Sequence, residues 1–191
     1  MIVITGSIAT GKSSVCRLIE SMGYAVVDAD IIAKELISAD VIKSLFGAKY
    51  IKNGEIDRKA LGSLVFTDAK QRVKLNEYIH PLVREEINKR VKELQHRGLK
   101  FVVDIPLFFE SGNYDDCLVC VVYCPKQKQI QRLIKRENLS KQEAIARVES
   151  QIDIEEKRQK ADFVIDNSQD EKHLLKETKK FIRYLDANFK V

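Results

Sequence analysis

A glycine-rich loop near the start of the chain constrains its fold more than any other feature of the sequence. Residues 6–13 read Gly-Ser-Ile-Ala-Thr-Gly-Lys-Ser, which matches the phosphate-binding pattern G-x-x-x-x-G-K-S/T without a gap. Such a loop needs a buried strand before it and a helix after it, because its backbone N–H groups and the helix dipole together form the anion site. The sequence therefore predicts a strand, a phosphate loop and a helix in succession.

Both expected neighbours of the loop are present. Residues 2–4 are a β-branched run, typical of a parallel strand that is buried on both faces. Residues 15–22 carry apolar side chains at helical spacing, and Gly23 is a stop signal. The alternative is a glycine turn with a surface lysine, and in this context we favour the phosphate loop.

The loop pattern assigns a role to each of its parts. Gly6 and Gly11 would let the backbone wrap closely around a phosphate. Lys12 would reach the β- and γ-phosphates of a nucleotide, and the Ser13 hydroxyl would hold Mg²⁺. The residues expected to bind ATP are Gly6, Ala9, Thr10, Gly11, Lys12, Ser13 and Ser14.

Two carboxylates follow the second predicted strand, residues 24–27. Asp28 and Asp30 stand at its carboxyl end, where ligands bind in an open α/β sheet, so we expect them to face the same crevice as the phosphate loop. The alternative is that Asp30 only caps a helix of residues 31–37, since aspartate is a favoured N-cap.

Composition bounds the class of protein. With 191 residues, 45% of them hydrophobic, the chain can bury one good core with a small appended lobe. The net charge of +5 comes from basic residues interleaved with acidic ones, which favours a pocket for phosphorylated ligands over a nucleic-acid surface. The N-terminal apolar run is too short for a signal peptide or a membrane span, so we expect a cytoplasmic protein without membrane contact.

Four cysteines raise the question of a metal or redox site. Cys117 and Cys120 are three apart in a segment that reads as a buried strand, where they would face opposite sides. We expect reduced thiols in the core.

The rest of the chain alternates helices and strands. Residues 31–97 read as helices without a strand: Asp40, Asp57 and Asp68 would each begin one, and Pro81 would begin the last. Residues 101–104, 118–123 and 163–167 read as further strands, which predicts a doubly wound parallel sheet. Capping boxes would start helices at Ser140 and Ser168.

Three further charged residues are candidates for chemistry. Asp104 ends an apolar strand, a weak likeness to a Walker B segment. Arg132 and Arg136 lie four apart on one helix face, within a charged hairpin whose low aliphatic content suits a mobile lid.

Almost the full length of the sequence resembles the bacterial dephospho-coenzyme A kinases. The resemblance rests on the loop of residues 6–14, on segments 27–30 and 104–110, on Leu75-Asn76 with His80-Pro81, on the two arginines and on segment 162–167. The family usually reads G-G-I-G-S-G-K-S in the loop, whereas this chain has Ser7, Ala9 and Thr10. Ala9 narrows the backbone conformations available to the loop.

The resemblance implies ATP-dependent phosphorylation of the ribose 3′-hydroxyl of dephospho-coenzyme A, the last step of coenzyme A synthesis. It implies a five-stranded P-loop core with strand order 2-3-1-4-5, with residues 1–191 forming a single domain: a core (1–30, 98–125, 161–191), a helical substrate lobe (31–97) and a lid (126–160). We expect a monomer that uses ATP and Mg²⁺.

The resemblance also distributes roles among the site residues. Asp30 would accept or orient the hydroxyl proton, while Lys12 and Mg²⁺ neutralise the transferring phosphoryl group. Arg132 and Arg136 would stabilise the transition state. The expected substrate-binding residues are Asp28, Asp30, His80 and Asp104, although a histidine at a helix junction is more often structural. The loop after Ile165 is the candidate for adenine contacts.

Three rival readings stay open. Shikimate and gluconate kinases share the P-loop, but relatives of shikimate kinase carry a Gly-Gly pair that this chain lacks. A GTP-dependent switch would carry Asn-Lys-x-Asp, which does not occur here. A structural ATP-binding module has no sequence feature against it, and an assay of ADP release would separate it from a kinase.

Overall fold

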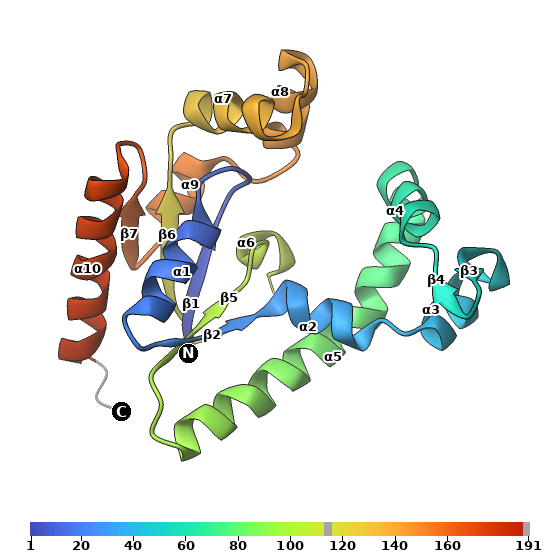
Figure 1. Ribbon diagram of the computed structural model, residues 1–191, viewed down its shortest axis with the longest axis horizontal. Helices are drawn as coiled ribbons and strands as arrows, with labels where there is room; N and C mark the ends of the chain where they lie inside the picture. The colour runs from blue at the N-terminus through green and yellow to red at the C-terminus, as the bar shows by residue number, and fades with distance from the viewer. Residues whose placement is uncertain (113–115, 189–191) are drawn as a thin grey trace. The chain divides into compact units, whose positions relative to one another are not determined.

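The computed structural model describes residues 1–112 and 116–188, except for the side chain of Phe66. The chain divides into two compact units (Figure 1): Met1–Asp28 with Glu93–Val191, and Ala29–Lys92. Segment 126–160, the expected lid, belongs to the first unit. None of the helices within the described residues is long and apolar enough to cross a membrane.

A five-stranded parallel sheet forms the centre of the first unit. Its strands are β1 (Ile2–Gly6), β2 (Ala25–Asp28), β5 (Phe101–Asp104), β6 (Leu118–Tyr123) and β7 (Phe163–Asp166). They lie in the order β2-β5-β1-β6-β7 and all neighbours pair in parallel, which confirms the predicted order. The central strands are apolar along their length because both faces of the sheet are covered.

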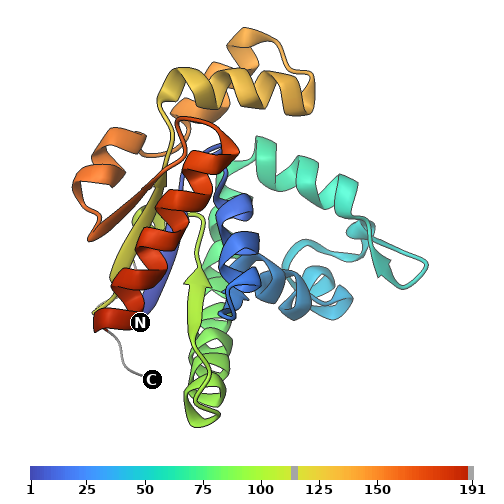
Figure 2. The same ribbon diagram turned by 60° about the vertical axis from the view of Figure 1, so that its left-hand side comes forward.

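Helices cover the sheet on both faces. On one face α1 (Lys12–Ser21) and α10 (Glu171–Asn188) lie side by side (Figures 1 and 2). Their apolar sides, which include Ile19 and Phe181, bury the sheet residues Ile4, Val122 and Ile165 in one core. On the other face α9 (Ile154–Gln159) packs against β6.

Three more helices complete the first unit. The short α6 (Phe108–Ser111) follows β5, and α7 (Lys126–Glu137) and α8 (Lys141–Glu149) form the charged hairpin. Ser140 starts α8 with the predicted capping box. The prediction for Ser168 is wrong: α10 starts at Glu171, and Asp170 accepts the N–H of His173 (2.8 Å) because it directly precedes the first turn.

The second unit is mainly helical. Its elements are α2 (Ala29–Leu36), α3 (Ala39–Phe46), η1 (Ala48–Tyr50), β3 (Ile51–Lys52), β4 (Glu55–Ile56), α4 (Arg58–Thr67) and most of α5 (Ala69–His96). Asp57 and Asp68 accept backbone N–H groups at the starts of α4 and α5, as predicted. The predicted cap Asp40 is wrong: Ser38 precedes α3 and accepts the N–H of Val41 (3.3 Å), so Asp40 lies in the first turn.

Two further predictions for this unit are wrong, and each has a local cause. The segment contains strands after all, because Asn53 and Gly54 both adopt positive φ and close the β3–β4 hairpin. Pro81 lies inside α5 instead of beginning a helix. The buried residues Ile79, Val83, Ile87 and Val91 continue one apolar stripe past it, so packing outweighs the one backbone hydrogen bond that proline cannot make.

Candidate active site

The phosphate loop connects β1 to α1 as predicted, and two of its residues hold left-handed backbone conformations. Gly11 has φ 91° and precedes the first residue of α1, while Ala9 has φ 60°. A left-handed alanine is strained by about 1–2 kcal/mol. At Ala9 the backbone therefore has a conformation that glycine would adopt without strain and that alanine adopts only at this cost.

Asn167 closes the loop from the side of β7. Its Nδ2 donates to the carbonyl of Thr10 (2.7 Å), and a Cβ added to Gly11 would lie only 2.1 Å from the same nitrogen. A side chain at position 11 would therefore have to displace the Asn167 amide, besides adopting the left-handed conformation that favours glycine. Asn167 lies in a segment that carries the family resemblance and in the loop expected near adenine, but its contact with the phosphate loop was not predicted; its position at a strand end was the available signal.

The two hairpin arginines have different surroundings. Arg132 donates from Nη1 to the carbonyl of Thr10 (3.3 Å) and from Nη2 to that of Asn167 (2.9 Å), so its guanidinium is held against the loop. Arg136 pairs with Glu137 (2.6 Å), and its side chain is 57% exposed. The structure brings Arg132 to the loop and places Arg136 on the surface of the hairpin.

Lys12 and Asp104 form an ion pair at the carboxyl edge of the sheet. Both carboxylate oxygens of Asp104 accept from the Lys12 ammonium, and the Asp104 side chain is only 4% exposed. Burial raises the pKa of Asp104 above its ordinary value although Lys12 acts in the opposite direction, and Asp28 adds to the rise. Asp28 is the register partner of Asp104 in the neighbouring strand, so two predicted site carboxylates stand side by side.

The other predicted site residues belong to the second unit. Asp30 is exposed and lies in the first turn of α2, which starts one residue earlier, so it does not precede the helix as the capping alternative required. His80 lies within α5, not at a helix junction, and burial lowers its pKa, with the positive charge of Arg84 adding to the effect.

A cavity of about 730 Å³ opens beside the loop within the first unit. Its lining combines the start of α1, the Arg132 side chain and the loop between β7 and α10, including Gly11, Ser14, Asn167 and Gln169. It is large enough for a nucleoside, and it involves the residues after Ile165 that were expected near adenine.

Three of the four cysteines, Cys16, Cys120 and Cys124, lie in the core as predicted, whereas Cys117 is only partly buried. Burial raises the pKa of the three buried thiols above the ordinary value. Within residues 1–112 and 116–188, no group of three or more His, Cys, Asp or Glu side chains could hold a metal ion. A metal at the loop would therefore have to take most of its ligands from phosphates and water, as Mg²⁺ does.

A phosphate loop that joins the central strand of a 2-3-1-4-5 parallel sheet to a helix, with aspartates at the adjacent strand ends, defines a P-loop kinase. The family model described as Dephospho-CoA kinase matches residues 1–173. The chain belongs to the dephospho-CoA kinase family.

Relatives and solved structures agree with this assignment. The chain is 41% identical to the dephospho-CoA kinase of Sulfurimonas denitrificans, over 98% of this chain and 95% of that one. It is 39% identical to that of Helicobacter pylori, with 96% of each chain covered. The solved dephospho-CoA kinase from Campylobacter jejuni has a TM-score of 0.75 and 37% identity, and covers 97% of this chain and 96% of its own. A shikimate kinase from Acinetobacter baumannii shares the fold alone, with a TM-score of 0.58 and 17% identity over 98% of this chain and 93% of that one.

Proposed function

We propose that this protein transfers the γ-phosphoryl group of ATP to the 3′-hydroxyl of the ribose of dephospho-coenzyme A, giving coenzyme A and ADP. The observation that carries this proposal is the match of one family model to residues 1–173, which include the phosphate loop, Asp28 at the end of β2, Asp30 in α2 and both hairpin arginines. The activity would be the last step of coenzyme A synthesis.

The nucleotide would bind along the first unit. The backbone N–H groups of the loop and the start of α1 face the β- and γ-phosphates, and Lys12 exchanges its contact with Asp104 for one with phosphate. The base and ribose occupy the 730 Å³ cavity beside Asn167. Arg132, already held against the loop, is the arginine best placed to stabilise charge on the transferring group.

The acceptor hydroxyl needs a group that takes or orients its proton. We assign this role to Asp30, with Asp28, His80 and Asp104 as further substrate-binding residues. Arg136 would have to leave Glu137 to act on the transition state, and its exposure permits this. Mg²⁺, held by Ser13 together with the phosphates, would neutralise charge on the nucleotide.

The proposal also covers the roles of the two units, the location and oligomeric state of the protein, its metal and its partners. The first unit would comprise a core and a lid of residues 126–160, and the second would be the substrate lobe. We further propose that the protein is a cytoplasmic monomer, that it depends on Mg²⁺, and that it binds neither nucleic acid nor membranes.

The test is a coupled assay of ADP release by the purified protein with Mg²⁺ and ATP. Dephospho-coenzyme A should support turnover far better than shikimate, gluconate or nucleoside monophosphates. Mass spectrometry of the product should show one added phosphoryl group. A higher rate with one of the other acceptors would assign the protein to a rival class of small-molecule kinase, and no turnover with any of them would favour a structural ATP-binding module.

A further inference from the structure

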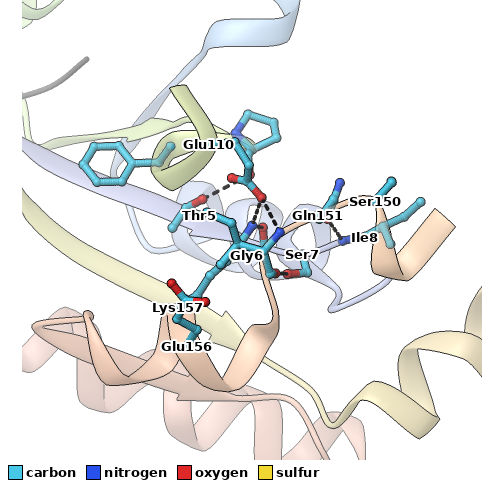
Figure 3. A network of polar contacts seen from close by, with 12 residues as sticks. Thr5, Gly6, Ser7, Ile8, Glu110, Ser150, Gln151, Glu156 and Lys157 are labelled. Atoms are coloured by element: carbon cyan, nitrogen blue, oxygen red, sulfur yellow. Dashed lines mark hydrogen bonds and ion pairs between the residues drawn. The ribbon is translucent and has the colours of Figure 1, made fainter. Parts of the chain in front are cut away.

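A fully buried lysine lies beneath the phosphate loop. The side chain of Lys157, in α9, is 0% exposed, and its ammonium forms an ion pair with Glu110 Oε1 (2.6 Å) (Figure 3). The same ammonium donates to the carbonyl of Gly6, the first residue of the loop (3.2 Å). Removing an ammonium group from water costs several kcal/mol unless charge and hydrogen bonds compensate it. Glu110 and the Gly6 carbonyl provide that compensation.

The chain segment that precedes α9 holds the loop at a second and a third point. The N–H of Ile8 donates to Gln151 Oε1 (2.8 Å), and the Ser7 hydroxyl donates to the carbonyl of Ile152 (3.5 Å). The N–H of Ile152 in turn donates to Glu110 Oε1 (3.2 Å). The Glu110 carboxylate, in α6, thus contacts both α9 and the segment that follows the hairpin, and through Lys157 it is linked to the start of the loop.

Apolar contacts join the same partners. The side chains of Ile8 and Ala9 pack against the small core of the α7–α8 hairpin, formed by Leu133, Ala144 and Val148. The hairpin therefore holds the loop both through side-chain packing and through the polar contacts at its end.

We propose that Glu110, Gln151 and Lys157, which we call the loop brace, are positioning residues that fix the phosphate loop in its nucleotide-binding conformation. The brace does not touch the reacting atoms. It fixes the Gly6 carbonyl and the Ile8 N–H, so that the following residues can hold the left-handed conformation at Ala9. Strained backbone of this kind persists only where the surrounding structure over-determines it. The proposal rests on the proposed function, because it explains how ATP is bound for that reaction.

The energetics of buried ion pairs distinguish this role from a purely structural one. Replacing a whole buried pair by apolar residues of similar volume is often neutral or stabilising for a fold. The double variant Glu110→Met/Lys157→Met removes both charges together, so it should stay folded and lose less stability than either single variant, which would leave one charge buried without its partner. If the pair positions the loop, the variant should still lose nucleotide affinity.

The matched control is an ion pair at the end of the same helix. Glu156 in α9 and Lys160, directly after the helix, form an ion pair of the same length (2.6 Å), but both side chains are 53% exposed and neither contacts the loop in any described interaction. The variant Glu156→Met/Lys160→Met removes the same charges from the surface. It should leave both nucleotide binding and turnover at wild-type levels.

A second pair of variants tests the brace at a residue that is uncharged in the wild type, so no buried charge is removed. Gln151→Glu keeps an oxygen that can accept the Ile8 N–H, whereas Gln151→Met removes it. We expect Gln151→Met to weaken nucleotide binding and Gln151→Glu to restore most of it. Since Gln151 is only partly buried, both proteins should fold.

The experiment measures ADP affinity by calorimetry, kcat and KM for both substrates, and melting temperature. Loss of the brace should lower ADP affinity and kcat/KM for ATP on the order of 10- to 100-fold, with KM for dephospho-coenzyme A changed less than about twofold. Wild-type ADP affinity in both Glu110→Met/Lys157→Met and Gln151→Met would overturn the proposal. So would losses of activity that only follow the unfolded fraction. If the wild type binds ADP but does not phosphorylate dephospho-coenzyme A, the proposed function fails while the affinity comparison still decides the role of the brace.

Discussion

Gly11→Ala tests the crowding between the phosphate loop and Asn167. The substitution has two costs that the structure separates. The first is backbone strain, because φ at Gly11 is 91° and alanine in the left-handed region costs about 1–2 kcal/mol. The second is steric, because the new methyl group would lie 2.1 Å from Asn167 Nδ2 and must displace it.

The steric cost follows from what Asn167 would lose. Its Nδ2 donates to the buried carbonyl of Thr10 (2.7 Å), which also accepts from Arg132 (3.3 Å). If the Asn167 amide is displaced, the carbonyl keeps Arg132 but the buried amide N–H loses its acceptor, and an unsatisfied buried donor costs about 1–3 kcal/mol. Alanine also reduces the conformational entropy of the unfolded chain, which stabilises the folded protein by about 0.4–1 kcal/mol. We therefore expect Gly11→Ala to lower the free energy of unfolding by about 1–4.5 kcal/mol, with a central value of about 3 kcal/mol.

Gly23→Ala is the matched control. Gly23 has φ 88°, close to that of Gly11, but a Cβ there would meet nothing within 4 Å. This variant carries the strain without the clash, so it should lose only about 1 kcal/mol. A difference of about 2 kcal/mol between the variants corresponds to about 4–8 °C in melting temperature for a chain of this size.

The assay is thermal and urea unfolding of both variants, with ADP affinity measured in parallel. Removing the Asn167 side chain in the Gly11→Ala background should cost less than it does in the wild type, since the clash is then relieved. Equal destabilisation by Gly11→Ala and Gly23→Ala, or additive effects of the Gly11 and Asn167 substitutions, would refute the steric reasoning.

The remaining predictions concern charged groups. Lys12→Ala should lower kcat by several orders of magnitude, and near-normal turnover would exclude the phosphate-loop assignment. The substitution also leaves the Asp104 carboxylate buried without its partner. In thermal unfolding, the double variant Lys12→Ala/Asp104→Asn should therefore be more stable than Lys12→Ala alone. Asp30→Asn should lower kcat strongly with nearly unchanged ATP affinity, and Asp28→Asn should do so less; loss of stability with kcat retained would assign Asp30 to the helix start instead. Hydrogen bonds from Lys100 and then Tyr24 hold the pKa of Asp186 below its ordinary value, so the unfolded chain binds this proton more readily. This contribution to the free energy of unfolding is fully present above the carboxyl pKa of the unfolded chain, and it is lost as the pH falls through the lower pKa of the folded protein. Asp186→Asn should therefore flatten the dependence of melting temperature on pH between about pH 5 and 2.

Much of the first unit was predictable because strong local signals coincide there. A phosphate loop requires a strand before it and a helix after it, and the β-branched runs and the glycine stop supplied both. Apart from the wrong helix start at Ser168, the errors lie in the second unit, where weak signals compete. Proline is a breaker in isolation, yet the apolar stripe of α5 carries the helix through Pro81. Two-residue strands such as β3 are too short for alternation to be visible.

The site divides in the same way. Motif spacing located Lys12 and the phosphate loop, and register explains why Asp28 and Asp104 are neighbours. No motif or register in the sequence indicated which residues would pair with buried charged side chains. Lys157 and Glu110 are 47 positions apart, and in a helix as polar as α9 a lysine reads as solvated. Only the packing of α9 on the sheet shows that its ammonium points inward.

The ion pair between Lys12 and Asp104 also changes what a measured nucleotide affinity means. A phosphate that approaches Lys12 does not meet a cation surrounded by water; it competes with a carboxylate that already contacts that cation. The free energy of binding at this position is therefore a difference between two salt bridges of similar kind. A ligand therefore needs enough negative charge to displace Asp104 from Lys12, so the binding free energy at this position should favour a triphosphate over singly charged anions.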